Sequence, residues 1–226
     1  MTVRGVFVTG TDTGIGKTRA SALLVRAQRA CGRRAIGMKP VASGCRETSE
    51  GLRNEDAEAL IAASDPAPPY ALCNPYAFAP PIAPHIAARE AAVAVALDPI
   101  IAAYRTLAGM ADRVVVEGVG GWAVPLSDAL MQADLVRALD VPVVLVVGLR
   151  LGCINHALLS ARAIRADGCV LAGWIANRID PDMARDDENL ATLSARIDAP
   201  LLGVLAHSSE PRDADVETLA AAAHVL

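Results

Sequence analysis

The stretch VRGVFVTGTDTGIGKT, residues 3–18, decides the fold of this chain. Residues 3–9 form a mostly apolar run rich in valine, which is typical of a buried strand. A glycine-rich turn follows, and over residues 17–31 apolar side chains recur on one face, as they do in an amphipathic helix. The order of strand, glycine-rich turn and helix predicts a loop that can bind a phosphate group.

The turn has the chemistry of a P-loop. Its glycines let main-chain N–H groups point inward, Lys17 is placed to reach the β- and γ-phosphates, and Thr18 can bind Mg²⁺. Four residues usually separate the two glycines of this motif, whereas five separate Gly10 from Gly16, so that Thr11 stands where the first glycine is expected. The context predicts nucleotide binding. The alternative is a glycine-rich turn that only caps a helix.

The rest of the chain alternates apolar runs with helical patterns, and the apolar runs lack the alternation of a half-exposed strand. This order predicts an α/β, P-loop NTPase-like parallel sheet with helices on both faces, in a single domain over residues 1–226. Residues 42–84, rich in proline and polar residues, are interpreted as an excursion that carries functional loops. Further strands are expected at 35–41, 114–116, 141–147, 170–176 and 201–205, and helices at 87–110, 131–140, 155–166, 182–197 and 213–223.

Composition sets limits on the class of protein. The 226 residues are 53% hydrophobic and 20% charged, which excludes an intrinsically disordered chain. No apolar run approaches the ~20 residues of a membrane span, and the N-terminus enters a strand pattern instead of a signal peptide, so we expect a cytoplasmic protein with no membrane partner. The net charge is −4 and the arginines are scattered, so we expect no nucleic-acid partner.

Cysteine and lysine usage are both informative. The five cysteines are odd in number and show no CxxC spacing, which argues against a disulfide framework and a zinc site. Of the 21 basic residues only Lys17 and Lys39 are lysines. An ammonium group is a compact charge and a guanidinium group is a wide planar fork, so these two lysines are candidates for positions that arginine cannot serve.

Two acidic residues are candidates for holding a metal ion. P-loop proteins need an acid at the end of a neighbouring strand, and Glu117 ends the run Val114 to Val116. The alternative is that Glu117 only caps a buried strand, with its carboxylate in solvent. Asp56 lies in the excursion, and its spacing alone indicates no more than the start of a helix.

Several stretches together resemble ATP-dependent dethiobiotin synthetases, the enzymes of the penultimate step of biotin synthesis. They are GTDTGIGKT (10–18), KPVASG (39–44), LRNEDA (52–57), NPYAFAPPIAPHI (74–86), EGVGGWAVPL (117–126) and LGCINHALLSARA (151–163). The similarity covers nearly the whole chain, and the five-residue spacing of the P-loop is the form that this family uses.

The resemblance implies a homodimer that closes a cyclic urea on 7,8-diaminopelargonic acid with carbon dioxide and ATP. One amine forms a carbamate, the carbamate attacks the γ-phosphate to give a mixed anhydride, and the second amine displaces phosphate. Cations must offset the repulsion between carbamate and triphosphate. By motif match the catalytic residues are Lys17, which holds phosphate, and Lys39, which bridges carbamate and γ-phosphate.

The resemblance also implies the remaining site residues. The magnesium set is Thr18, Asp56 and Glu117, and Thr13 and Ser43 line the substrate and phosphate region. Ala176 and Asn177 match the place where the base is read. Nucleotide contacts are expected at Thr13, Gly14, Ile15, Gly16, Lys17, Thr18, Asp56, Glu117, Gly118, Val119, Gly120, Ala176, Asn177, Ala206, His207 and Ser208.

The base end of the site leaves two alternatives open. Where the family often has proline and an aromatic residue after the last strand, this chain has Ala206-His207-Ser208. The run 177–180, Asn-Arg-Ile-Asp, is one substitution from the Asn-Lys-x-Asp motif that recognises guanine, although Asp180 beside a proline is also typical of a turn. ATP is therefore the expected nucleotide and GTP the alternative.

The tail of the substrate carries a carboxylate that needs its own site. The turn before the helix expected at 155–166 offers main-chain N–H groups and a helix dipole, and Gly152 permits close approach. The alternative is an ordinary turn with Asn155 as N-cap. The resemblance places this turn at the substrate tail across the dimer interface. The expected substrate-binding residues are Ser43, Gly152, Cys153, Ile154, Asn155 and Asn189.

Two related classes of P-loop protein are rivals. Partition or septum-positioning ATPases carry an additional lysine early in the loop, where this chain has Thr11 and Asp12, and residues 213–226 form no basic amphipathic helix. Cobyrinate-type amidases need a second domain with a cysteine nucleophile, for which 226 residues leave no room.

Overall fold

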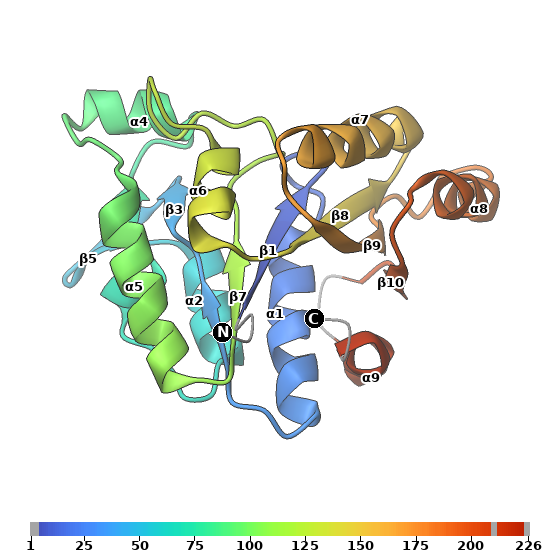
Figure 1. The fold of residues 1–226 in the computed structure, drawn as a ribbon, viewed down its shortest axis with the longest axis horizontal. Coiled ribbons are helices and arrows are strands. Elements are labelled where there is room, and N and C mark those ends of the chain that lie inside the picture. The colour runs from blue at the N-terminus through green and yellow to red at the C-terminus, as the bar shows by residue number, and fades with distance from the viewer. Residues whose placement is uncertain (1–4, 209–211, 224–226) are drawn as a thin grey trace.

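The computed structural model describes residues 5–208 and 212–223, and its framework is one sheet of six parallel strands (Figure 1). The strand order is β10-β9-β8-β1-β7-β2, so the first strand of the chain lies inside the sheet. The fold class predicted from the sequence is confirmed. The strands are β1 (Gly5–Gly10), β2 (Ala35–Met38), β7 (Arg113–Glu117), β8 (Val143–Leu149), β9 (Leu171–Arg178) and β10 (Leu201–Leu205).

Helices cover both faces of the sheet (Figure 1). Successive side chains of β1 point to opposite faces, so Phe7 joins one core while Val6 and Val8 join the other. Both faces are covered, which is why the strands are unbroken apolar runs. One face carries α1 (Lys17–Ala30), α2 (Glu55–Ala63) and α9 (Asp213–Ala222), and the other carries α5 (Leu97–Met110), α6 (Gln132–Leu139), α7 (Cys153–Ala166) and α8 (Asp186–Arg196).

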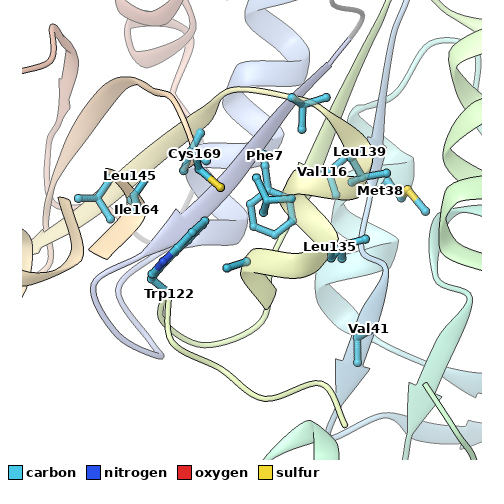
Figure 2. Packing of buried hydrophobic residues seen from close by; sticks show 14 of the residues in the cluster. Phe7, Met38, Val41, Val116, Trp122, Leu135, Leu139, Leu145, Ile164 and Cys169 are labelled. Atoms are coloured by element: carbon cyan, nitrogen blue, oxygen red, sulfur yellow. The ribbon is translucent and has the colours of Figure 1, made fainter. Parts of the chain in front are cut away.

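The larger core lies under α6 and holds the loop that follows β7 (Figure 2). Phe7 and Val116 pack there with Leu135 and Leu139 of α6. Trp122 is 4% exposed, and its indole Nε1 donates to Asp167 Oδ2 at 2.7 Å, which satisfies its only donor. The loop after Glu117 is therefore anchored by a buried aromatic side chain.

The excursion over residues 42–84 leaves the central sheet, as the sequence predicted. Two short sheets form there, one parallel and one antiparallel. The parallel pair is β3 (Val41–Ser43) with β6 (Tyr76–Phe78), the antiparallel pair is β4 (Arg46–Thr48) with β5 (Gly51–Arg53), and the helices beside them are α3 (Tyr70–Cys73) and α4 (Pro84–Glu90).

The strand predicted at 35–41 is wrong in its second half. The central strand β2 ends at Met38, and Val41 begins β3 in the separate parallel pair. Pro40 has no N–H to donate to a sheet, and the N–H of Lys39 turns to the carbonyl oxygen of Cys73 at 2.8 Å. The break releases Lys39 from the sheet and lets its side chain enter the site.

The single helix predicted at 87–110 is also wrong, because the chain forms α4 and α5 with a turn between them. Ala92 takes a positive φ of 53°, and the N–H of Val93 donates to the carbonyl oxygen of Ala88 at 2.9 Å, which closes α4 in the manner of a Schellman motif. Val95 is 5% exposed in the core. The alanine-rich sequence gives no composition signal for this stop.

Smaller differences concern element ends. The helix predicted from residue 155 begins at Cys153, and the helix predicted from residue 182 begins at Asp186.

All five cysteines are free; four are buried and Cys31 is exposed. Within the described ranges, none of the helices combines the length and apolar character needed to cross a membrane.

Candidate active site

Three neighbouring strands end at one edge of the sheet and bring the polar side chains together. The strand β1 runs into the P-loop, β7 ends at Glu117, and Lys39 follows Met38 at the end of β2. Val8 pairs with Glu117 and Met38 with Val116, so these strand ends are level. Open parallel sheets bind ligands beyond the carboxyl ends of their strands, so this edge is the candidate site.

Lys39 is the centre of a buried ionic cluster. Its Nζ donates to Glu117 Oε1 at 2.7 Å, to Asp56 Oδ2 at 2.8 Å and to the carbonyl oxygen of Gly118 at 3.2 Å. The side chains of Lys39 and Glu117 are 4% and 0% exposed, whereas Asp56 is 39% exposed. Removing either buried partner would leave an uncompensated charge in the interior.

Asp56 is delivered to this cluster by the first turn of α2. Asn54 is the N-cap, and its side-chain oxygen accepts from the N–H of Ala57 at 3.2 Å. The hydroxyl of Tyr70 holds the N–H of Asn54 at 2.8 Å, which fixes where the helix starts. The carboxylates therefore come from segments 61 residues apart, and no local spacing could have paired Asp56 with Glu117.

The charges of the cluster shift its pKa values. Burial lowers the pKa of Lys39, but the charges of Glu117 and Asp56 outweigh burial and raise it above its ordinary value. Burial raises the pKa of Asp56, and the charge of Lys39 outweighs it, so this pKa falls below its usual range. For Lys17, burial and then the charge of Lys39 lower the pKa to about 8. A bound anion would therefore stabilise the charged form of Lys17.

A compact set of oxygen atoms lies beside Lys39. Thr18 Oγ1 is 2.6 Å from Asp56 Oδ1 and 2.9 Å from Glu117 Oε1. Glu117 Oε2 is buried and has no hydrogen-bond partner among the described residues, so it is an acceptor that a cation would satisfy. Hydroxyl and carboxylate oxygens suit Mg²⁺, which takes its remaining ligands from water and phosphate. These residues fit magnesium, although residues 5–208 and 212–223 hold no group of three His, Cys, Asp or Glu side chains arranged for a metal.

The P-loop wraps around the Lys17 side chain. Lys17 Nζ donates to the carbonyl oxygen of Asp12 at 2.8 Å. The carboxylate of Asp12 accepts from Arg150 at 2.5 Å and from the N–H of Thr13 at 2.7 Å. Gly16, with a φ of 82°, is the N-cap of α1, so the loop leads directly into a helix N-terminus.

These groups open onto a cavity of about 830 Å³, a volume ample for a nucleotide and a small substrate. Eleven of the residues singled out from the sequence line it, from the P-loop, the excursion and the loop after β7. They are Thr13, Gly14, Gly16, Lys17, Thr18, Lys39, Ser43, Asp56, Glu117, Val119 and Gly120.

The structure adds lining residues that the sequence did not single out. Asn54 is one of them, and residues 81–84, where α4 begins, are others. The run 74–86 carried part of the family resemblance. That resemblance is a signal for residues 81–84, whose residue types alone indicate no chemical role. The others are Ala42, Gly121, Val124 and Pro125.

Ile15 and Gly118 were predicted to contact nucleotide but do not line the cavity. Ile15 is 1% exposed and packs in the core beneath the loop. Gly118 is crowded, since an ideal Cβ would lie 2.8 Å from the Phe7 ring and 2.5 Å from Gln132 Oε1. The contacts of Ile15 and Gly118 with the nucleotide remain predictions.

The predicted base reader, Asn177, lies behind the P-loop. It ends a buried stretch of β9 after Ala176, and neither residue lines the cavity. Asn177 Nδ2 donates to the carbonyl oxygen of Ile15 at 2.9 Å, and Asn177 Oδ1 accepts from Arg19 at 3.2 Å. Asn177 therefore supports the P-loop from behind, and its contact with the base remains a prediction.

The segment after β10 lies beside Asn177, as its predicted contact with the base requires. Leu205 pairs with Asn177 in the sheet, and the carbonyl oxygen of the next residue, Ala206, accepts from Arg19 at 2.8 Å. His207 Nδ1 is 3.3 Å from the carbonyl oxygen of Arg178. Ser208 is described, whereas residues 209–211 lie outside the described residues.

The predicted tail site lies at the start of α7, away from the cavity of this single chain. Gly152 is the N-cap, with a φ of 94°, in place of the Asn155 that the sequence offered as an alternative. Cys153 is buried, Ile154 is half-buried and Asn155 is exposed. Asn189 Nδ2 donates to the carbonyl oxygen of Arg185 at 2.7 Å. None of these residues lines the P-loop cavity, although Arg150, two residues before Gly152, pairs with Asp12 of the P-loop.

Comparisons with known proteins identify the family. A family model described as an AAA domain matches residues 4–212. An ATP-dependent dethiobiotin synthetase BioD from Xylella fastidiosa (strain 9a5c) is 59% identical over 224 residues, which cover 99% of this chain and 98% of that protein. This chain belongs to the ATP-dependent dethiobiotin synthetase family. A second relative of that name, from Xanthomonas euvesicatoria pv. vesicatoria (strain 85-10), is 62% identical over 197 residues, 87% of this chain and 88% of the relative.

Solved structures show that the synthetase family shares its fold with other P-loop proteins. A ParA family ATPase from Chlorobium tepidum TLS has a TM-score of 0.56 at 13% identity, covering 99% of this chain and 92% of that one. A chain of the MinC:MinD cell division protein complex from Aquifex aeolicus has a TM-score of 0.55 at 11% identity, covering 95% of this chain and 86% of that one. At such identities the likeness shows the fold alone. The rival ATPase class therefore shares the fold of this chain.

The close approach of Gly16 to Asn177 predicts a sensitive position. An ideal Cβ on Gly16 would lie 2.2 Å from Asn177 Nδ2, and the positive φ adds strain of roughly 1–2 kcal/mol. We expect Gly16→Ala to weaken ATP binding at least tenfold, measured by calorimetry, because Asn177 and the loop cannot both keep their places. Gly32→Ala is the matched control, since Gly32 has a φ of 76° at the other end of α1 and nothing within 4 Å. Equal losses in both variants would contradict the role of Asn177.

Proposed function

We propose that this synthetase closes the ring of dethiobiotin from 7,8-diaminopelargonic acid, carbon dioxide and ATP, in a Mg²⁺-dependent reaction. Family membership supports an ATP-dependent enzyme of biotin synthesis. The observation that carries the chemistry is the juxtaposition of Lys39 and Lys17 at one cavity, beside the carboxylates of Asp56 from α2 and Glu117 from β7. Two cations at one site suit a reaction between two anions.

The proposed steps need cations more than they need a base. An amine adds carbon dioxide to give a carbamate and a proton. A carbamate oxygen then attacks the γ-phosphorus, ADP leaves, and the second amine attacks the carbonyl carbon of the mixed anhydride and expels phosphate. Lys17 holds the phosphate chain and Lys39 lies between carbamate and γ-phosphate. Amine and carbamate are themselves the nucleophiles, so no protein base is assigned.

Thr18, Asp56 and Glu117 would hold the magnesium ion of this reaction. The ion would supply charge that offsets the anionic phosphates, as in other phosphoryl transfers. The buried, unpartnered Oε2 of Glu117 supports this assignment, as does the short distance of 2.6 Å between Thr18 Oγ1 and Asp56 Oδ1. Ser43 Oγ is also buried without a partner among the described residues and lines the cavity, which supports its role toward substrate or phosphate.

ATP is the proposed nucleotide, with Asn177 at the base. The guanine alternative rested on Asp180, whose carboxylate Oδ1 instead accepts from the N–H of Asp182 at 3.0 Å, as the side chain at the start of a turn does. That contact favours the turn interpretation of the run 177–180.

The substrate carboxylate is proposed to bind at the start of α7, in a pocket completed by a second subunit. Leu151, in the turn before α7, is 94% exposed, and Leu159 of α7 is 55% exposed. Large exposed apolar residues in this turn and on α7 support a protein contact there. The tail-site residues do not line the cavity in one chain. In a homodimer, the tail site of one subunit would lie beside the P-loop cavity of the other. Asn189 is proposed to assist from α8.

Gly152→Val tests the tail site. A Cβ at Gly152 meets nothing within 4 Å, so crowding by this chain is not the cause of the effect that we expect. A valine would instead strain the backbone at φ 94° and stand over the proposed carboxylate site. We expect a KM for diaminopelargonic acid raised about tenfold or more with ATP binding unchanged.

Gly168→Val is the matched control for this strain. Gly168 ends the same helix with a φ of 76° and nothing within 4 Å. Both variants should lose roughly 1–2 kcal/mol of unfolding free energy, but only Gly152→Val should raise KM. Normal diamine binding by Gly152→Val, or full activity from a protein that sedimentation experiments show to be monomeric, would contradict the placement of the substrate carboxylate at the start of α7.

A product assay tests the proposed function as a whole. Purified protein would be mixed with diaminopelargonic acid, bicarbonate, Mg²⁺ and one nucleoside triphosphate at a time, and dethiobiotin measured by mass spectrometry. We expect product with ATP and ADP in equal amount. A strong preference for GTP that is lost in Asp180→Ala would reverse the nucleotide assignment, and no ureido product from any triphosphate would refute the reaction.

A further inference from the structure

Arg19 is the next residue after Thr18 in α1, but its side chain contacts the base end of the P-loop region instead of the oxygen cluster. It is 12% exposed. One terminal nitrogen donates to Asn177 Oδ1 at 3.2 Å and to the carbonyl oxygen of Ala206 at 2.8 Å. The other donates to Asp215 Oδ2 on α9 at 2.6 Å. One guanidinium therefore joins the ends of β9 and β10 to α1 and α9.

This contact fixes the orientation of the Asn177 side-chain amide. Asn177 Nδ2 faces the carbonyl oxygen of Ile15, and Asn177 Oδ1 faces Arg19. Exchanging oxygen and nitrogen would set a carbonyl against a carbonyl and an NH₂ group against a guanidinium, which offers no acceptor. With Arg19 in place only one orientation of the amide is satisfied.

The Arg19 fork also aligns main chain that Asn177 does not touch. Leu205 and Asn177 are paired at the ends of β10 and β9, and Ala206 continues from Leu205. Because one nitrogen binds both Asn177 Oδ1 and the Ala206 oxygen, it sets the position of the segment after β10 relative to the amide. An ammonium group has no planar fork and cannot keep all three contacts in this arrangement.

We propose that Arg19 is a positioning residue that determines base selectivity, by holding the Asn177 amide and the Ala206 main chain in one arrangement of donors and acceptors. The inference rests on the proposed use of ATP with Asn177 at the base. Nucleotide bases differ in the donors and acceptors along their edges, so a fixed amide discriminates between them and an amide free to flip does not.

The surroundings of Asp215 allow the effect of Arg19 on base selectivity to be measured apart from its effect on protein stability. Its side chain is 3% exposed, and besides Arg19 it accepts from Arg212 Nη2 at 2.9 Å. Removing Arg19 therefore leaves Asp215 paired. Arg26, seven residues along the same helix, offers a matched control. It pairs with Asp213 of α9 at 3.0 Å and, among the described residues, makes no hydrogen bond to Asn177 or Ala206.

The test measures ligand binding by titration calorimetry with Mg²⁺ present. The proteins are the parent, Arg19→Met, Arg19→Lys and the control Arg26→Met, and the ligands are ATP, GTP and tripolyphosphate, which has no base. We expect both Arg19 variants to bind ATP about tenfold more weakly, the loss of a hydrogen-bonded support, and the ratio of ATP to GTP affinity to shrink by a similar factor. Tripolyphosphate affinity should stay unchanged, and Arg26→Met should match the parent.

Other outcomes overturn the inference. If the Arg19 variants keep the parental affinity ratio, Arg19 does not set selectivity; if tripolyphosphate weakens as much as ATP, Arg19 only supports the P-loop. Should Arg19→Met fail to fold, Arg19→Lys decides, because it keeps a positive charge beside Asp215. A parent protein that does not bind ATP refutes the inference and the proposed function together, whereas a parent that binds ATP but makes no dethiobiotin refutes the reaction alone.

Discussion

Replacing Lys39 by alanine, or even by arginine, is expected to lower kcat by about 10²–10³-fold, the usual cost of one lost electrostatic contact to developing charge. Lys39 is 4% exposed and fits between Glu117 and Asp56 at 2.7 and 2.8 Å. A guanidinium is wider than an ammonium and presents its donors in a fixed plane, so Lys39→Arg cannot reproduce both contacts and still face two substrate anions. Steady-state kinetics at saturating ATP and diamine measure the effect.

The structure adds a stability cost to the alanine variant. Without Lys39 the Glu117 carboxylate, 0% exposed, keeps Thr18 as its one hydrogen-bond partner within residues 5–208 and 212–223. Breaking such a buried pair commonly costs about 3–5 kcal/mol of unfolding free energy, which would lower the melting temperature by several degrees. Arg46→Ala is the control, since it removes an exposed ion pair to Glu58 on α2 and should keep the parental kcat. Parental activity in Lys39→Arg would contradict the bridging role.

Glu117→Gln is expected to lower kcat about 10²-fold and to raise the Mg²⁺ concentration for half-maximal activity at least tenfold. An amide keeps the shape of the side chain but carries no negative charge toward Lys39 or a metal ion. Glu117 Oε1 already serves Lys39 and Thr18, and Oε2 has no partner among the described residues, so both oxygens matter. Activity titrated with Mg²⁺ gives the half-saturation.

Glu55→Gln is the control for the metal assignment. Glu55 is exposed and precedes Asp56 in the first turn of α2, so the same charge is removed near the cavity without touching the oxygen cluster. Its magnesium dependence should equal that of the parent. If Glu117→Gln also showed the parental half-saturation, the assignment of Thr18, Asp56 and Glu117 to the metal would be wrong.

Much of the architecture could be predicted because it depends on local patterns. Unbroken valine-rich runs indicate strands covered on both faces, and β1, the P-loop and α1 follow from residues 3–31 alone. The errors arose where single residues change the course of the main chain. Pro40 ends β2 early, and proline is a sequence signal that the predicted strand 35–41 did not use. Ala92 takes a positive φ that nothing in an alanine-rich run signals.

The site residues also divide into those that a local pattern indicates and those that only the fold brings together. Lys17 and Thr18 follow from the P-loop, and Lys39 was marked by the scarcity of lysine. Asp56 gained a role only from the family resemblance, because its partner Glu117 is brought near by the fold and not by spacing. Arg19 has no sequence signal, since its three acceptors come from β9, the segment after β10, and α9.

In the proposed reaction a carbamate oxygen attacks ATP and leaves with phosphate. Carbon dioxide labelled with ¹⁸O at both oxygens, mixed rapidly with enzyme, diaminopelargonic acid and MgATP and quenched within one turnover, tests this step in one mass-spectrometric measurement. We expect one ¹⁸O in each phosphate released and one in the ureido carbonyl of dethiobiotin. Unlabelled phosphate formed together with dethiobiotin would contradict it, because ATP would then have been cleaved by water and not by the carbamate.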